Sequence, residues 1–244
     1  MDHEGRISIC KEYAARLKEK IGSDLVFFGV GGSTYTKEDR EDSDIDAIVV
    51  TESENYGGAP KWIHEWHNGI QLSIEYFNKT EAERILKNPG WGWPQNMFTL
   101  TNQMPIYQKY NFLEWCTGII NTIDYQLFID SAYKQITIAK SAIGKVRKAH
   151  TMGDLGFIRS AALLTLTYID MAVALINKDA LYPGFSIREV LLLMSKYRIL
   201  PDKYVETARK IWDSCDGEEI NNSIEYLLDS TYALINVIKT NNKD

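Results

Sequence analysis

The chain has 244 residues, of which 45% are hydrophobic and 25% charged, and its formal net charge is −6. This length suits one large domain or two modest ones. The acidic balance argues against duplex DNA or tRNA as the main partner, because such binding rests on many Lys and Arg contacts to phosphates. A small cationic partner fits better. With no leader segment and no apolar run near the roughly 18 residues that span a bilayer, we expect a soluble cytoplasmic protein with no membrane partner.

The chain begins with a predicted helix followed by a predicted strand. Apolar residues recur at close to the helical period and give the helix one buried stripe: Ile9, Tyr13, Leu17 and Ile21. The run Leu25 to Val30 is too short for a buried helix and rich in Val and Phe, which favours a strand. We expect the helix to cover the sheet that contains this strand.

A glycine-serine turn follows the strand. Glycines at 31 and 32 let the backbone turn sharply and approach a ligand closely, and the polar segment Thr34 to Arg40 predicts a short exposed helix. Phosphate oxygens favour such a helix start. We therefore expect Gly32 and Ser33 to hold phosphates through backbone N–H groups and a hydroxyl, with Lys37 as a further candidate.

Two carboxylates then occupy alternate positions. Period-two alternation into the strand-like run Ala47 to Val50 puts Asp44 and Asp46 on one face and Ile45 on the other. Like charges about 7 Å apart repel unless a cation lies between them, and carboxylate oxygens suit Mg²⁺ completed by substrate phosphates and water. The alternative is an Asp-rich turn before an ordinary strand. The order of strand, turn, paired acids and strand favours a site for Mg²⁺ and a nucleoside triphosphate.

The next segments are a predicted helix and a third strand. We interpret Lys61 to Gly69 as a polar and aromatic helix, and His64 and His67 within it as ordinary side chains rather than metal ligands, since no further His or Cys is near. The aromatic and β-branched run Ile70 to Phe77 predicts a strand. Glu75 lies in it, either on a solvated face or as the third carboxylate of the metal site, and we favour the second role.

The second half of the chain is predicted to be helical. Residues 89–107 are rich in Trp, Gly and Pro, which indicates a loop that leads into an edge strand at Met104 to Tyr107. From Asn111 onward no alternation remains, and Asp170 in the most apolar helix is interpreted as a structural residue bonded to a hydroxyl. The predicted fold class is α+β: a small mixed β-sheet domain over residues 1–110, then a helical bundle domain over 111–244. The helices are expected at Ile123 to His150, Leu155 to Asn177, Ile187 to Tyr197, Asp202 to Trp212 and Glu218 to Ile238.

The paired acids and the turn carry a family resemblance. A Gly-Ser turn followed about ten residues later by Asp-x-Asp resembles the nucleotidyltransferase superfamily that includes DNA polymerase β. Further landmarks resemble the kanamycin nucleotidyltransferase type of aminoglycoside nucleotidyltransferase: His64-Glu65-Trp66 with Gly69, then Trp93-Pro94 and Pro105-Ile106-Tyr107. This resemblance implies a nucleotidyltransferase domain, a helical domain that covers the acceptor, and a homodimer.

The resemblance also identifies one candidate in the helical domain and one departure. The family carries a general-base glutamate four residues before a phosphate-binding lysine, and the similar run here is Ser141 to Lys145. Lys145 matches the lysine, although a solvated lysine in a basic run remains the alternative. Ser141 stands at the glutamate position and cannot act as the same base, so Glu75 is predicted to be both metal ligand and general base.

These expectations combine into one hypothesis about activity. The chain is expected to transfer a nucleoside monophosphate from a nucleoside triphosphate to a hydroxyl of a small cationic acceptor such as an aminoglycoside antibiotic. ATP is the first candidate for the triphosphate. Mg²⁺ is the expected cofactor. The predicted catalytic and metal residues are Asp44, Asp46 and Glu75, and the predicted nucleotide-binding residues are Gly32, Ser33, Lys37 and Lys145. The alternatives are a non-catalytic or regulatory protein of the same fold, or an enzyme that nucleotidylates a protein partner.

Overall fold

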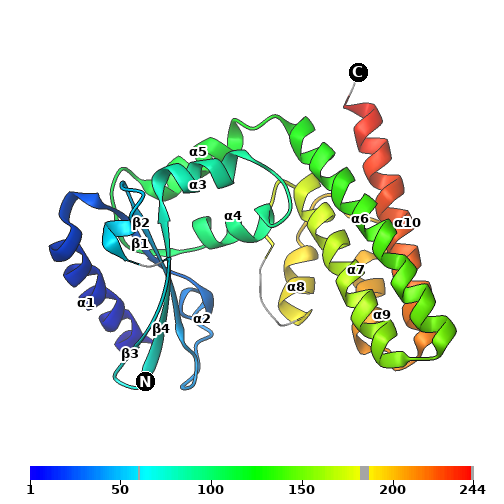
Figure 1. Cartoon of the computed structure of the whole chain (residues 1–244), viewed down its shortest axis with the longest axis horizontal. Coiled ribbons are helices and arrows are strands. Elements are labelled where there is room, and N and C mark those ends of the chain that lie inside the picture. Colours follow the sequence, from blue (N-terminus) through cyan, green and yellow to red (C-terminus); the bar gives the residue numbers. More distant parts are fainter. Residues whose placement is uncertain (60, 182–186, 243–244) are drawn as a thin grey trace. The chain divides into compact units, whose positions relative to one another are not determined.

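The computed structural model describes residues 1–59, 61–181 and 187–242, which form two compact units (Figure 1). The first unit comprises Met1–Asn88 and Thr99–Thr122, and the second comprises Pro89–Phe98 and Ile123–Asp244. The helix α4 (Trp93–Thr101) begins in the second unit and ends in the first. The domain boundary predicted near residue 110 stays a prediction.

The first unit contains a mixed sheet, which confirms the predicted α+β class. Within the described residues its strands follow the order β3-β4-β2-β1-β5. The pair β2 and β4 is parallel, whereas the other neighbouring pairs are antiparallel. The strands are β1 (Leu25–Val30), β2 (Ile45–Thr51), β3 (Trp62–His67), β4 (Ile70–Asn78) and β5 (Met104–Gln108).

One face of this sheet is the hydrophobic core of the unit. The helix α1 (His3–Ile21) packs on it as predicted, with the stripe residues Ile9, Tyr13 and Leu17 buried. From the strands, alternate residues such as Ile45, Leu72 and Ile74 join the same cluster. Because side chains alternate along a strand, their neighbours Asp44, Asp46 and Ser73 belong to the opposite face. The core therefore fixes which residues this second face presents.

Some helices of the first unit begin at a side-chain cap and others do not. Asn78 caps α3 (Lys79–Lys87) by accepting a hydrogen bond from the Glu81 amide. On the sheet face away from α1, the ring of Phe112 in α5 (Phe112–Asn121) lies 4.8 Å from that of Phe27, measured between centroids. The predicted helix from Thr34 to Arg40 is shorter and begins earlier, as α2 (Gly32–Thr36).

The predicted helix from Lys61 to Gly69 is wrong, since this segment is the edge strand β3. Its exposure alternates strictly, and its partner β4 is joined by Asn68 and Gly69, both with positive φ. Such an Asn-Gly pair forms the two-residue turn that matches the twist of a hairpin. Likewise, the segment predicted as a loop before β5 contains the helix α4.

The second unit is the predicted helical bundle. Its long helices α6 (Tyr125–Met152), α7 (Leu155–Ile176) and α10 (Gly217–Asn241) lie side by side (Figure 1), with α8 (Ile187–Met194) and α9 (Tyr204–Asp213) completing the set. Asp154 caps α7 by accepting a hydrogen bond from the Phe157 amide at 2.9 Å. Gly153 ends α6 in the left-handed conformation.

The helix α7 is the one described helix whose length and hydropathy would also suit a membrane span, but 61% of its apolar window is buried inside the bundle. Asp170 in this helix accepts a hydrogen bond from the Tyr204 hydroxyl of α9, which confirms the predicted bond to a hydroxyl. Helix α7 is therefore a core helix of the bundle.

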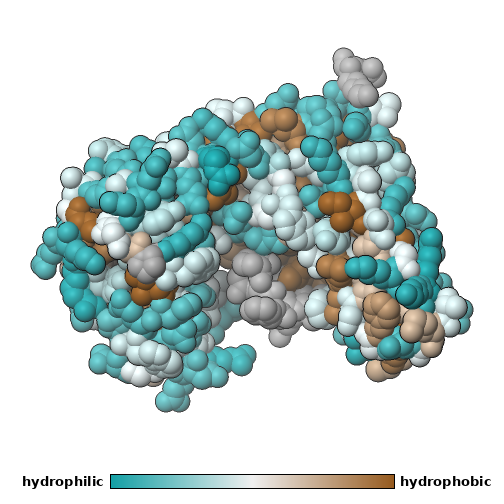
Figure 2. Space-filling model, in the orientation of Figure 1, coloured by the Kyte–Doolittle hydropathy of each residue, from teal (hydrophilic) through white to brown (hydrophobic). Residues whose placement is uncertain are grey.

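The surface of the first unit that is visible in Figure 2 is largely hydrophilic, with scattered hydrophobic side chains.

Candidate active site

The turn after β1 and the start of β2 are in direct contact. The Gly31 amide donates a hydrogen bond to the Asp46 carbonyl at 2.9 Å. Gly32 has a φ of +56°, and a Cβ atom there would lie 2.4 Å from Asp46 Oδ2. Glycine is favoured at this position, because a larger residue would be strained at this φ and would displace the Asp46 carboxylate. The structure thus brings Gly32 and Asp46 together, and Ser33 is the next residue of the turn.

Ser33 is half-buried, and its hydroxyl has no hydrogen-bond partner among the described residues. Its carbonyl accepts hydrogen bonds from the Thr36 hydroxyl at 3.2 Å and from the Glu38 amide at 2.9 Å, which holds the short helix α2 closed. Lys37 ends this helix in the left-handed conformation with an exposed side chain. Ser33, the residue after Gly32, therefore keeps a hydroxyl available for a ligand.

Asp44 and Asp46 lie on the sheet face opposite to the core, on either side of the buried Ile45. Desolvation, followed by the negative charge of Asp44, raises the pKa of Asp46 to about 6. A raised pKa means that the ionised form is disfavoured, and a cation shared by both carboxylates would remove that cost. The pair therefore has the chemistry of a site for a hard divalent cation.

Glu75 lies on the same face, but the strand register separates it from the pair. In the parallel ladder Asp46 is opposite Ser73, and Glu75 is opposite Ile48, two residues further along. Desolvation raises the pKa of Glu75 to about 7, with Lys61 opposing this change and Glu81 adding to it. Over the described part of the chain no three His, Cys, Asp or Glu side chains gather as a metal site. The structure brings Asp44 and Asp46 together without Glu75, whose role stays a prediction.

A polar network that the sequence analysis missed lies directly opposite Asp46. The Ser73 hydroxyl donates to Asp44 Oδ2 at 3.4 Å and lies 3.1 Å from His64 Nδ1. The Gln71 side-chain amide donates to the same hydroxyl at 3.2 Å. Alternation along β3 and β4 was the available signal, since it places His64, Gln71 and Ser73 on the face of the two acids once β3 is taken as a strand.

A second feature that the sequence analysis missed is the anchor of the loop before Asp44. Arg6 of α1 is fully buried and donates to the carbonyls of Ser43 and Arg40, both at 2.5 Å, and of Glu41 at 3.2 Å. Its Nε also lies 3.4 Å from Asp39 Oδ2. The signal was a charged residue within the buried stripe of an amphipathic helix, four residues before Cys10.

Lys145 and Ser141 lie on α6 in the second unit, and both are exposed. The role of Lys145 at the triphosphate stays a prediction.

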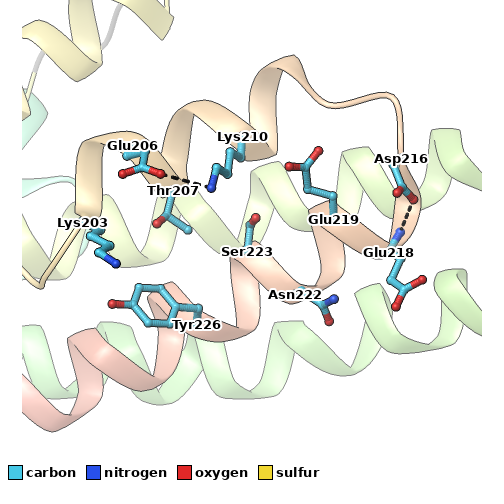
Figure 3. Close-up of a pocket in the computed structure, with 10 residues that line it drawn as sticks. All are labelled: Lys203, Glu206, Thr207, Lys210, Asp216, Glu218, Glu219, Asn222, Ser223 and Tyr226. Carbon is cyan, nitrogen blue, oxygen red and sulfur yellow. Dashed lines mark hydrogen bonds and ion pairs between the residues drawn. The ribbon is translucent and has the colours of Figure 1, made fainter.

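The same unit has an open groove of about 690 Å³ between α9 and α10 (Figure 3). Its charges satisfy one another in part: Lys210 pairs with Glu206 at 3.1 Å, and Asp216 caps its own helix by accepting from the Glu218 amide.

Comparison with known proteins adds to this geometry. No family model matches the chain. The chain is 25% identical over 171 residues to aminoglycoside nucleotidyltransferase (4′) from Staphylococcus aureus, and equally to that of a Bacillus species. The aligned part covers 66% of this chain and 62% of each relative, so it spans less than two thirds of their length. These likenesses support the nucleotidyltransferase family.

A solved structure extends the nucleotidyltransferase likeness to the fold. The nucleotidyltransferase-like protein from Exiguobacterium sibiricum superposes with a TM-score of 0.51 over 93% of this chain and 74% of its own, at 9% sequence identity. At such an identity the match describes the fold alone. It covers the mixed sheet followed by helices that the nucleotidyltransferase resemblance had implied.

Proposed function

We propose that this chain transfers a nucleoside monophosphate from a nucleoside triphosphate to a hydroxyl of a small acceptor, with ATP as the first candidate donor. The observation that carries the proposal is the pair Asp44 and Asp46 on an open sheet face, with the Asp46 carboxylate against the Gly32 turn. Paired carboxylates next to a turn that a ligand can approach closely are the parts that phosphoryl chemistry needs. The names of the similar relatives, aminoglycoside nucleotidyltransferases, support the same reaction class.

The donor set fits Mg²⁺. Asp44 and Asp46 offer carboxylate oxygens from one face, and the raised pKa of Asp46 indicates a negative charge that lacks a positive partner. Two carboxylates are the usual protein share of such a site, with phosphates and water as the other ligands. Bound there, Mg²⁺ would neutralise charge on the phosphate oxygens.

The protein residues then position the triphosphate. Backbone N–H groups at Gly32 and the unpartnered hydroxyl of Ser33 donate to phosphate oxygens, and Lys37 supplies a nearby positive charge. Lys145 is the proposed cation from the helical unit. Because the acceptor hydroxyl must attack in line with the departing pyrophosphate, holding the triphosphate rigidly supplies much of the rate enhancement.

The acceptor is proposed to be a small cationic molecule of the aminoglycoside type, as the relatives' names suggest. Trp62 and Trp66 are 56% and 70% exposed on the face that carries the two acids. Exposed aromatic rings attract ammonium groups and pack against sugar rings, and the net charge of −6 favours a cationic ligand. A cytoplasmic location, a homodimer and a role in antibiotic resistance remain parts of this proposal.

A non-catalytic or regulatory role is the second candidate. It is favoured by the lack of a third acid near Asp44 and Asp46 among the described residues, and by Ser141 at the position where the family carries a glutamate. In that case the chain would bind the triphosphate without turning it over.

One experiment separates the two candidates. The protein is incubated with Mg²⁺, each nucleoside triphosphate in turn and a panel of aminoglycosides and lincosamides, and pyrophosphate release is measured. Release that depends on both acceptor and Mg²⁺, and that Asp46→Asn abolishes, supports the transferase. Triphosphate binding without release by any acceptor supports the regulatory candidate.

A further inference from the structure

Glu75 and an exposed tryptophan occupy neighbouring positions on the sheet face opposite to the core. In the hairpin register, Glu75 of β4 is directly opposite Trp62 of the edge strand β3. The flanking residues Ile74 and Tyr76 belong to the core cluster, so Glu75 stands on the other face, where Trp62 is 56% exposed. Residues directly opposite in an antiparallel pair have Cβ atoms about 4.5–5.5 Å apart. A carboxyl group and an exposed indole ring are therefore neighbours.

The carboxylate of Glu75 is half-buried and has no hydrogen bond or ion pair to any other residue that the structure describes. The charge of Lys61 acts on Glu75, but the ammonium group of Lys61 is paired with Glu81 at 2.6 Å. Desolvation dominates and raises the pKa of Glu75 to about 7. A half-buried carboxylate without a counter-ion is costly to ionise, and a ligand cation at this position would remove that cost.

The surroundings of Glu75 suit an organic cation better than Mg²⁺. Glu75 follows Ser73, the residue opposite Asp46, by two positions, which is about 7 Å along the strand. No three His, Cys, Asp or Glu side chains gather as a metal site within the described chain, whereas Mg²⁺ needs several oxygen ligands in close contact. An ammonium group needs less: it donates hydrogen bonds to one carboxylate and is attracted to the face of an indole ring.

The position of this pair also matches the proposed reaction. An acceptor whose hydroxyl lies at Asp44 and Asp46 extends over the same sheet face, and about 7 Å further along β4 it reaches Glu75. Amino sugars carry hydroxyl and ammonium groups at separations of this size. One acceptor molecule can therefore place its hydroxyl at the two acids and an ammonium group at Glu75.

We propose that Glu75 and Trp62 bind an ammonium group of the acceptor and so select aminated acceptors, an inference that rests on the proposed function. The Glu75 carboxylate accepts hydrogen bonds from the ammonium group, and the indole ring of Trp62 attracts its charge. In this role Glu75 is neither a metal ligand nor the general base. Its loss therefore weakens acceptor binding and leaves the chemical step intact.

The test begins with Glu75→Gln, which removes the charge and keeps the shape of the side chain. The probe is kanamycin, titrated in calorimetry with Mg²⁺ and an ATP analogue that cannot be cleaved between the α- and β-phosphates. The Kd for kanamycin should rise about 10- to 100-fold, as expected for a lost hydrogen bond to a charged group, and Trp62→Ala should raise it about two- to fivefold. In turnover assays KM should rise by the same factors, with kcat within about threefold.

Two controls separate this contact from a general effect of charge. Glu83→Gln removes the same charge from α3, where Glu83 pairs with Lys87 on the surface, and should keep the Kd for kanamycin within about twofold. Kanamycin acetylated on all its amino groups has lost the ammonium charge. The wild-type chain should bind this derivative as weakly as Glu75→Gln binds kanamycin, and Glu75→Gln should weaken its binding no further.

The outcomes distinguish this inference from the proposed function. Weaker binding of kanamycin in Glu75→Gln, without a change for the acetylated derivative, supports the inference. An unchanged Kd for kanamycin overturns it, and so does a wild-type chain that binds no kanamycin. If Glu75→Gln instead lowers kcat about 100-fold, weakens Mg²⁺ binding or changes the preference among triphosphates, Glu75 serves the chemistry or the nucleotide, and the proposed function still stands. A wild-type chain that binds kanamycin but releases no pyrophosphate with any acceptor overturns the proposed function alone.

Discussion

Replacing Arg6 by methionine removes the guanidinium that anchors the loop before Asp44 while keeping most of the apolar stem. Arg6 is fully buried, and it donates to three loop carbonyls and lies beside Asp39, whose side chain is only 4% exposed. In Arg6→Met the Asp39 carboxylate loses this cation, and His3, 2.8 Å away, compensates only when protonated. We expect the first unit to be strongly destabilised.

The magnitude follows from the kind of contact that is lost. Removing one partner of a buried ion pair costs about 3–5 kcal/mol, because the remaining charge stays buried without compensation. Each hydrogen bond to a charged group contributes about 1.5–3 kcal/mol, but the freed carbonyls lie in an exposed loop and regain water, so these values do not add. We predict a loss of about 3–5 kcal/mol in the free energy of unfolding of the first unit.

Urea unfolding followed by tryptophan fluorescence measures this loss, because Trp62, Trp66 and Trp115 belong to the first unit. Lys11→Met is the control, since Lys11 is an exposed residue of the same helix and should change stability by less than about 0.5 kcal/mol. The double variant with Asp39→Asn should recover at least about 1 kcal/mol by removing the unpaired charge. A loss below about 1 kcal/mol in Arg6→Met would refute the role of Arg6 as an anchor.

The remaining predictions concern ligand binding and pH. Ser33→Ala should weaken triphosphate binding by about 1.5–3 kcal/mol in calorimetry, the cost of one hydrogen bond to a charged group, and an unchanged Kd rules Ser33 out. Trp66→Ala should raise the KM for an aminoglycoside about two- to fivefold with kcat unchanged, as for an exposed cation–π contact worth about 0.5–1 kcal/mol; a change in kcat alone would contradict this. Burial raises the pKa of Asp170 to about 7. The stability that its protonation contributes is therefore fully present below about pH 4, the pKa of Asp in an unfolded chain, and is lost as pH rises through 7. Wild-type stability of the helical unit should therefore fall by about 2–4 kcal/mol between pH 4 and pH 8 in urea titrations, and Asp170→Asn should remove most of this slope.

The face of Asp44 and Asp46 was predictable from sequence because it depends on local alternation alone. A buried Ile45 between two acids leaves no other arrangement once the segment is a strand. The caps of α3 and α7 were predictable for the same reason, since Asn78 and Asp154 act on amides three residues away. Signals that act over a few residues along the chain can be interpreted without knowledge of the tertiary structure.

The relation of Glu75 to the acids was not predictable, because it depends on the register between two strands that are distant in sequence. A parallel register that pairs Asp46 with Ser73 puts a hydroxyl, not a carboxylate, beside the acids. The strand β3 was misassigned because its polar and aromatic residues were interpreted as a helix, whereas Asn68-Gly69 was a local signal for a hairpin.

The central claim is that Asp44 and Asp46 support transfer of a nucleotidyl group, and the fate of the phosphorus atoms tests it most directly. Parallel reactions with ATP labelled at the α- or the γ-phosphate, Mg²⁺ and an aminoglycoside follow where each label goes. The account predicts that the α-label appears on the acceptor and the γ-label in pyrophosphate, and that Asp46→Asn leaves both in ATP. A γ-label on the acceptor, or α-label transfer by Asp46→Asn within tenfold of the wild-type rate, would contradict it.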